Sequence, residues 1–194
     1  MGRSDIPLAQ RLRMQRQAEI VHNREQAAKA AMFCTSVALH EVEGIGYKRI
    51  MRFAQRFKEV DSEFYEDPVV GMAHAKARMA QFGMPISGEL FTVQRENLRD
   101  ALMENHALQA AQIALICGAI AMNDVFGFAE ERQMRVSKRA NELTDRYARE
   151  GMGFLLAEME KIGFLIVDGE VRGYLDDDGN AVTPKRAIME GYGD

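Results

Sequence analysis

The sequence predicts a mostly α-helical protein with two tandem three-helix repeats, whose long first helices pack together, and a small C-terminal β-hairpin. Three observations predict this fold. Proline is rare, at 4 of 194 residues. Residues that favour helices are frequent, including 13 methionines. Long segments without a helix breaker are separated by glycines, and one such unit recurs later in the chain.

The first predicted helix covers residues 8–43. Ser4 and Pro7 resemble a helix start, and nothing after them interrupts the pattern. Small and apolar residues recur on one face, from Leu12 to Val42. At about 1.5 Å per residue such a helix is on the order of 50 Å long, so we expect a partner of similar length. Gly44 and Gly46 end it.

Glycines and a proline bound the later elements in the same way. Short apolar runs after Gly163, separated by Asp-Gly turns, predict a small hairpin or three-stranded meander. We therefore divide the chain into repeat 1 (1–83), repeat 2 (84–163) and a β-hairpin with its tail (164–194). The further helices are predicted at 47–65, 69–82, 95–125, 130–149 and a short segment ending at 162, with a connector over 84–92.

Charge is distributed unevenly along the chain. Residues 1–58 hold 11 Lys/Arg and 5 Asp/Glu, a net +6, while the remainder holds 14 and 24, a net −10, and the two sum to −4. A basic first third favours contact with a polyanion or with an acidic surface, although solvated helix faces explain it equally simply. No apolar run approaches the roughly 18–20 residues of a membrane span, and two cysteines do not suggest a disulfide framework. We expect a cytoplasmic protein of a bacterial host cell.

The repeat is visible when residues 26–64 are placed over residues 109–147, an offset of 83. Thirteen of 39 positions are then identical, without a gap. The match indicates an internal duplication and predicts a fused pseudo-dimer. The identical pairs are Gln26/Gln109, Ala27/Ala110, Ala28/Ala111, Ala31/Ala114, Cys34/Cys117, Ala38/Ala121, Val42/Val125, Gly44/Gly127, Arg49/Arg132, Met51/Met134, Arg52/Arg135, Arg56/Arg139 and Glu59/Glu142.

Small residues form the first shared group. They let two helices approach closely, so we expect the long helices to pack on each other with Cys34 and Cys117 near the crossing, as buried thiols. A carboxylate before the turn, Glu41 or Asp124, is the second. A carboxylate near a helix C-terminus needs a cationic partner, and Arg49 and Arg132 are the expected ones.

The third shared group is a basic helix face. Steps of three and four residues place its arginines on one side of each helix. Salt bridges to acids such as Glu59 and Glu142 would explain the face, and an anion-binding surface is the functional alternative. The candidate binding residues are Lys48, Arg49, Arg52 and Arg56 in the first copy and Arg132, Arg135 and Arg139 in the second.

Residues 42–48, Val-Glu-Gly-Ile-Gly-Tyr-Lys, resemble the hairpin of helix-hairpin-helix DNA-binding proteins. The resemblance implies that Gly44 and Gly46 would let backbone N–H groups face a phosphate of DNA. The second copy departs from the pattern, with Ala129 in place of the second glycine.

Residues 38–50 show a longer pattern, with Leu39-His40-Glu41, then Gly44-Ile45-Gly46, then Lys48 and Arg49. This resembles an uncharacterised helical domain of small phage and prophage proteins of Gram-positive bacteria, whose pattern is Leu-His-Asp, Phe-Gly-Phe-Gly, a basic residue and Arg-Leu. The second copy matches at Asn123-Asp124, Gly127 and Arg132. The resemblance implies a phage accessory protein but assigns no reaction.

The favoured function is therefore a non-enzymatic binding protein of phage type that engages a host or phage protein handling nucleic acid, with inhibition of host defence as one such role. Direct DNA or RNA binding through residues 44–48 and the arginines is the second hypothesis. An enzyme using Glu41 and Asp124 is a third. The histidines lack metal-ligand spacing, and no phosphate-binding loop or nucleophile turn is present, so we expect no cofactor, metal or catalytic residue. The long helices could also drive homo-oligomerisation.

Overall fold

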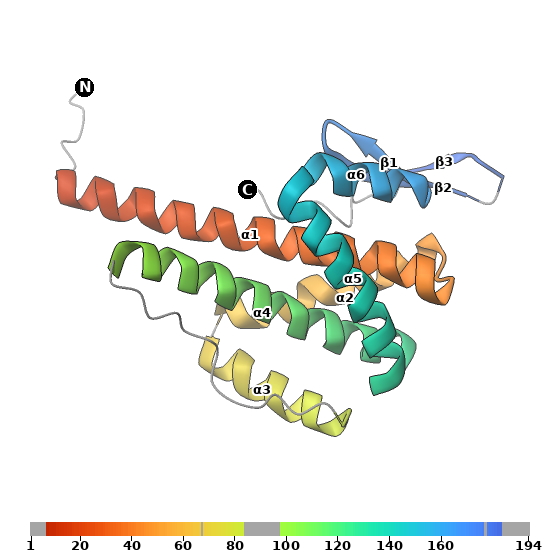
Figure 1. Cartoon of the computed structure of the whole chain (residues 1–194), viewed down its shortest axis with the longest axis horizontal. Coiled ribbons are helices and arrows are strands. Elements are labelled where there is room, and N and C mark those ends of the chain that lie inside the picture. Colours follow the sequence, from red (N-terminus) through yellow and green to blue (C-terminus); the bar gives the residue numbers. More distant parts are fainter. Residues whose placement is uncertain (1–6, 67, 84–97, 177, 184–194) are drawn as a thin grey trace.

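The computed structural model describes residues 7–66, 68–83, 98–176 and 178–183. These residues form six helices followed by a three-stranded antiparallel sheet (Figure 1). The predicted connector over 84–92 and the C-terminal tail from 184 lie outside the described residues. The elements are α1 (Leu8–Glu43), α2 (Tyr47–Glu66), α3 (Pro68–Gln81), α4 (Leu98–Phe126), α5 (Glu130–Glu150), α6 (Met152–Lys161), β1 (Phe164–Val167), β2 (Glu170–Leu175) and β3 (Ala181–Val182).

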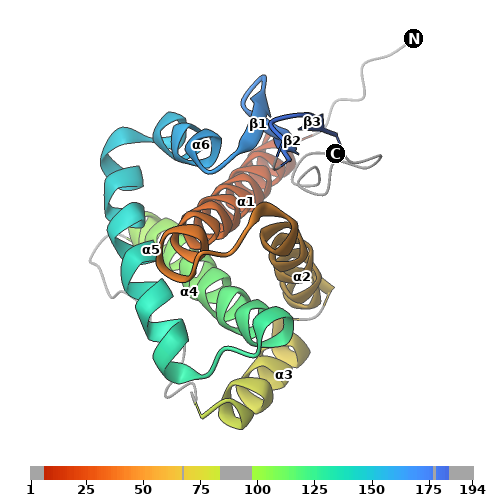
Figure 2. The same cartoon turned by 90° about the vertical axis from the view of Figure 1, so that its right-hand side faces the viewer.

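The two long helices α1 and α4 lie side by side, with the shorter helices around them (Figures 1 and 2). α1 packs against α4 and α5, and α2 packs against α4. The predicted mostly α fold with packed long helices and a small C-terminal β element is therefore confirmed. One continuous core of buried residues runs between these helices, with Phe33, Phe57 and Leu143 among its largest fully buried side chains.

Small residues on α1 and α4 let neighbouring helices approach these two helices closely. Cys34 and Ala38 on α1 are buried, as are Cys117 and Ala121 on α4. Gly118 on α4 lies beside Phe57 of α2 and Thr35 of α1. Because such positions offer little side-chain bulk, neighbouring helices can gain dispersion contacts along their length.

The first sixteen residues of α1 differ from the rest of the helix. The sequence predicts that Leu12 and Val21 lie on a buried face, but both are exposed, as are Leu8 and Met14. The N-terminal end of α1 extends beyond α4 on the side of the N-terminus (Figure 1). The prediction is wrong here because the partner helix α4 leaves these side chains uncovered within the described part of the chain. We call residues 8–23 the projecting segment of α1.

The apolar window Gln109–Phe126 of α4 is long enough to cross a membrane by length and composition, with a mean hydropathy of 1.3. Half of that window is buried inside the molecule. The expectation from the sequence that no apolar run approaches the length of a membrane span is therefore wrong for this window, whose helix packs on α1 and α2.

The sheet has the strand order β1-β2-β3, as expected for a meander. Asp168 and Gly169 both adopt positive φ in the turn between β1 and β2. In the second turn, the Asp176 Oδ1 atom accepts hydrogen bonds from the backbone N–H groups of Asp178 and Asn180, at 3.1 and 2.7 Å. This carboxylate therefore closes a turn.

Gly173 provides a test of the sheet. A Cβ atom at this position would lie 2.4 Å from the carbonyl oxygen of Val182, which is backbone and cannot move aside cheaply. We expect Gly173→Ala to lower the free energy of unfolding by about 1–3 kcal/mol, measured by urea denaturation. Gly153→Ala is the matched control, since nothing lies within 4 Å of its Cβ position and alanine favours a helix. Equal stability of the two variants would contradict this packing.

Candidate binding surface on helix α2

The turn between α1 and α2 contains the two glycines of the predicted hairpin. Gly44 ends α1 in the left-handed conformation, with φ at 63°. The N–H groups of Gly44 and Ile45 donate to the carbonyl oxygens of His40 and Leu39, at 3.0 and 3.2 Å. The N–H group of Gly44, one of the two glycines expected to face a phosphate, therefore makes its hydrogen bond within this turn.

A side chain from α1 also holds this turn. His40 Nδ1 lies 3.1 Å from the carbonyl oxygen of Ile45, and Ile45 is buried. In the second copy Asn123 Nδ2 donates to the carbonyl oxygen of Phe128 at 3.1 Å, and Phe128 is buried too. Asn123 and Phe128 follow His40 and Ile45 by the same 83 residues. The His40 position of the pattern, occupied by Asn123 in the second copy, thus holds the turn in both copies.

The carboxylates before the two turns both bind arginine, but not the expected arginines. Glu41 Oε2 accepts a hydrogen bond from Arg139 Nε at 2.7 Å, which joins α1 to α5. Asp124 Oδ2 accepts one from Arg56 Nε at 2.7 Å, which joins α4 to α2, and is also paired with Arg78. Arg139 and Arg56 are again 83 residues apart. The expectation that Arg49 and Arg132 bind these carboxylates is wrong, because each long helix packs on the second helix of the other repeat.

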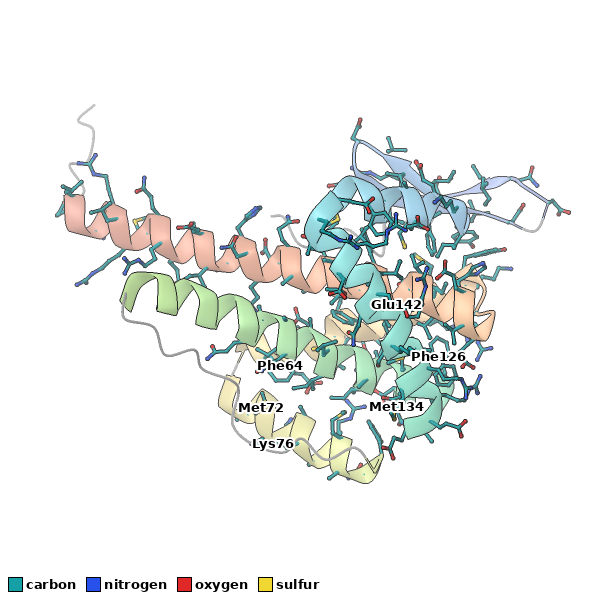
Figure 3. The ribbon with its side chains drawn as sticks, in the orientation of Figure 1. Phe64, Met72, Lys76, Phe126, Met134 and Glu142 are labelled. Carbon is teal, nitrogen blue, oxygen red and sulfur yellow. The ribbon has the colours of Figure 1, made fainter. Side chains whose placement is uncertain are left out.

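The same two arginines make the salt bridges that the sequence predicts along the helix. Arg56 donates to Glu59 at 2.8 Å and Arg139 donates to Glu142 at 2.9 Å. Each guanidinium therefore lies between two carboxylates, one from its own helix and one from the other repeat. Glu142 is seen on α5 in Figure 3.

A second pair of equivalent contacts lies at the ends of α1 and α4. Glu43 accepts hydrogen bonds from Arg132 at 2.6 Å and from Arg135 at 2.9 Å, both from α5. The equivalent of Glu43 is Phe126 (Figure 3), and Arg49 lies over its ring at 5.2 Å from the centroid. An ion pair in one half thus corresponds to a cation–π contact in the other. We call these contacts the inter-repeat clasp, formed by Glu41, Glu43, Arg49, Arg56, Asp124, Phe126, Arg132, Arg135 and Arg139.

The electrostatics of the clasp favour charged carboxylates. Burial raises the pKa of Glu43, but hydrogen bonds from Arg132 and Arg135 outweigh it and lower the pKa below the ordinary value. For Asp124, burial likewise raises the pKa, while hydrogen bonds from Arg78 and Arg56 lower it overall. A carboxylate with a lowered pKa is a poor proton acceptor near neutral pH. Arg56 and Arg78 therefore hold Asp124 as a charged carboxylate.

Both cysteines are buried, as the sequence predicts, and each contacts one of the shorter helices. Cys117 Sγ on α4 is 3.9 Å from Asp61 Oδ1 on α2. Cys34 on α1 forms a hydrogen bond with the side chain of Thr144 on α5. Thr144 follows Asp61 by 83 residues. Burial raises the pKa of both thiols, so they stay protonated and behave as small buried side chains. Within the described residues, no group of three or more His, Cys, Asp and Glu side chains could hold a metal ion.

The predicted binding residues therefore separate into two sets. Arg56, Arg132, Arg135 and Arg139 are held by carboxylates of the chain. Lys48, Arg49 and Arg52 on α2 have no carboxylate partner in the described ranges. Of these, Arg49 lies over Phe126, and the Lys48 ammonium lies 5.8 Å from the ring centroid of Tyr47.

A groove of about 390 Å³ lies between α2 and β2. Tyr174 of β2 reaches α2, where its ring stacks on Tyr47 with centroids 4.1 Å apart. The sheet thus closes one side of the groove, and sequence patterns along α2 give no sign of this contact. The lining residues are Lys48, Met51, Arg52, Gln55, Arg56, Glu59 and Tyr174.

Comparison with known proteins gives no relative. No protein-family model matches the chain, and no curated protein or solved structure is significantly similar to it. The functional argument therefore depends on the residues and contacts described above.

Glu43 tests the inter-repeat clasp. Its side chain is 6% exposed, so Glu43→Gln removes a buried charge that two arginines bind, and we expect a loss of about 1–3 kcal/mol in the free energy of unfolding. Glu131→Gln is the matched control, because that side chain is 89% exposed and, among the described residues, pairs with Arg135 alone. We expect it to cost about 0–0.5 kcal/mol in the same urea titration. A control as costly as Glu43→Gln would argue against the clasp.

The clasp also predicts a pH dependence. Because the folded-state pKa of Glu43 lies below its ordinary value of 4.5, the stabilisation is complete above that value and is lost as pH falls through the lowered pKa. We expect the stability difference between wild type and Glu43→Gln to be full at about pH 7 and to shrink below about pH 4. Urea denaturation of both proteins across this range measures it. A difference that is constant with pH would contradict the assignment.

Proposed function

We propose that this chain is a non-enzymatic accessory protein of phage type that binds another protein through the projecting segment of α1. The observation that carries the proposal is the exposure of Leu8, Leu12, Met14 and Val21 on residues 8–23. Four large apolar side chains on one short helical segment gain stability only when a partner covers them.

The charge of the segment indicates the kind of partner. Arg11, Arg13 and Arg16 lie among the apolar residues, with Glu19 as the segment's acid. A basic and apolar helix complements a protein surface that is acidic and apolar. Nucleic acid would use the arginines but would leave Leu12 and Met14 uncovered, so a protein suits this segment better.

The biological role rests on the resemblance to the phage domain. We propose a partner that handles nucleic acid in the host or phage, in the cytoplasm of a bacterium, and inhibition of a host defence as the consequence of binding. The clasp fits a binding function better than catalysis, because most of the recurring polar residues form ion pairs that hold the two repeats together.

Direct binding of DNA or RNA is the second candidate. It is favoured by one observation, that Lys48, Arg49 and Arg52 have no carboxylate partner among the described residues. It is weakened by the pairing of the other four predicted arginines, because a charged strand needs several free cations along its path.

Affinity capture from a bacterial lysate tests the first candidate. We expect the full-length chain to retain a specific protein after nuclease treatment, and Leu12→Ser to lose most of it. Leu115→Ser is a close control, since Leu115 on α4 is 55% exposed and Leu12 is 56% exposed. Equal capture by the two variants, or capture that nuclease abolishes, would contradict the proposal.

A mobility-shift assay tests the second candidate. Direct binding predicts a shift at low salt that weakens steeply as salt rises and is lost in the triple variant Lys48→Ala, Arg49→Ala, Arg52→Ala. No shift at low salt would exclude this candidate. A shift that the triple variant retains would exclude this surface.

A further inference from the structure

The groove between α2 and β2 joins a cationic wall to an aromatic one. Lys48 and Arg52 are four residues apart, so they lie on the same face of α2, and both are exposed. Met51, which is 7% exposed, and Tyr174 supply apolar surface beside them. Cations next to apolar and aromatic surface suit a ligand that is anionic at one end and planar at the other.

The size of the groove points to a small molecule. Its volume of about 390 Å³ falls within the roughly 300–1,000 Å³ of small-molecule sites. The neighbouring Arg56 is held in place by Asp124 and Glu59, which makes that end of the groove rigid. Gln55 Nε2 donates to Glu59 Oε1 at 3.1 Å, so an amide and a carboxylate are fixed at the same end.

We propose that this groove binds a free nucleotide. Its phosphate pairs with Lys48 and Arg52, because ammonium and guanidinium groups are the usual phosphate ligands. Its base packs against Tyr174 and Met51, and Gln55 with Glu59 offers a donor and an acceptor to the edge of the base. The site is independent of the projecting segment of α1.

Two features favour a free nucleotide over a nucleic-acid strand. Only Lys48, Arg49 and Arg52 lack a carboxylate partner among the predicted binding residues described, too few for a continuous phosphate track. The groove also needs the sheet. At the equivalent position on α5, Met134 is 60% exposed (Figure 3), so the face that carries Arg135 and Lys138 offers no such covered apolar floor.

Isothermal titration calorimetry on the full-length chain tests the proposal, with four ribonucleoside monophosphates, adenosine and inorganic phosphate as separate probes. We expect at least one monophosphate to bind about tenfold or more tightly than either adenosine or phosphate, since only it uses both walls. Arg52→Ala should weaken that binding by about tenfold, and Lys48→Ala with Arg52→Ala by more. Lys138→Ala removes an exposed cation from the equivalent face of α5 and should change nothing.

Three results would overturn the site. Phosphate that binds as tightly as every monophosphate would indicate attraction to charge alone. Binding that survives the double variant while Lys138→Ala weakens it would move the site to α5. A single-stranded oligonucleotide that binds while no monophosphate does would replace the small-molecule site by a strand-binding surface. Thermal denaturation of each variant shows whether it is folded.

Discussion

The arrangement of the helices depends on the ion pairs of the inter-repeat clasp. Arg139 of α5 binds Glu41 of α1, and Arg56 of α2 binds Asp124 of α4. Each pair joins a long helix of one half to the second helix of the other half. α1 and α4 each pack against several neighbouring helices. Directional hydrogen bonds between guanidinium and carboxylate groups add specificity to this packing.

The clasp also changes the meaning of the recurring arginines. A basic face on a helix predicts an anion-binding surface when its partners are unknown. Here Glu43 alone binds two of these arginines, and its side chain is almost fully buried. An arginine that is already paired with a carboxylate of the protein attracts an external anion weakly, because the carboxylate repels the same anion. The binding surfaces that we propose therefore lie outside the clasp.

Those surfaces are of two kinds. The projecting segment of α1 is basic and carries the exposed apolar side chains of Leu8, Leu12, Met14 and Val21. The groove on α2 is small, with one cationic and one aromatic wall. The first suits a protein surface and the second a small anion, because an extended helix can bury a large area while a groove of this size cannot.

Periodicity and helix breakers in the sequence determine most of the secondary structure, including the limits of α1 and the meander after Gly163, because these are local properties of the backbone. The 83-residue offset likewise marks Glu41, Asp124 and the arginines of the clasp before any contact is known, but it does not mark Glu43 or Phe126. The partners of Glu41 and Asp124 could not be predicted, since they come from the other repeat, 98 and 68 residues away in sequence. The same holds for the exposure of Leu12 and for Tyr174 beside α2. Only the tertiary structure decides them, because they depend on which helices and strands meet in space.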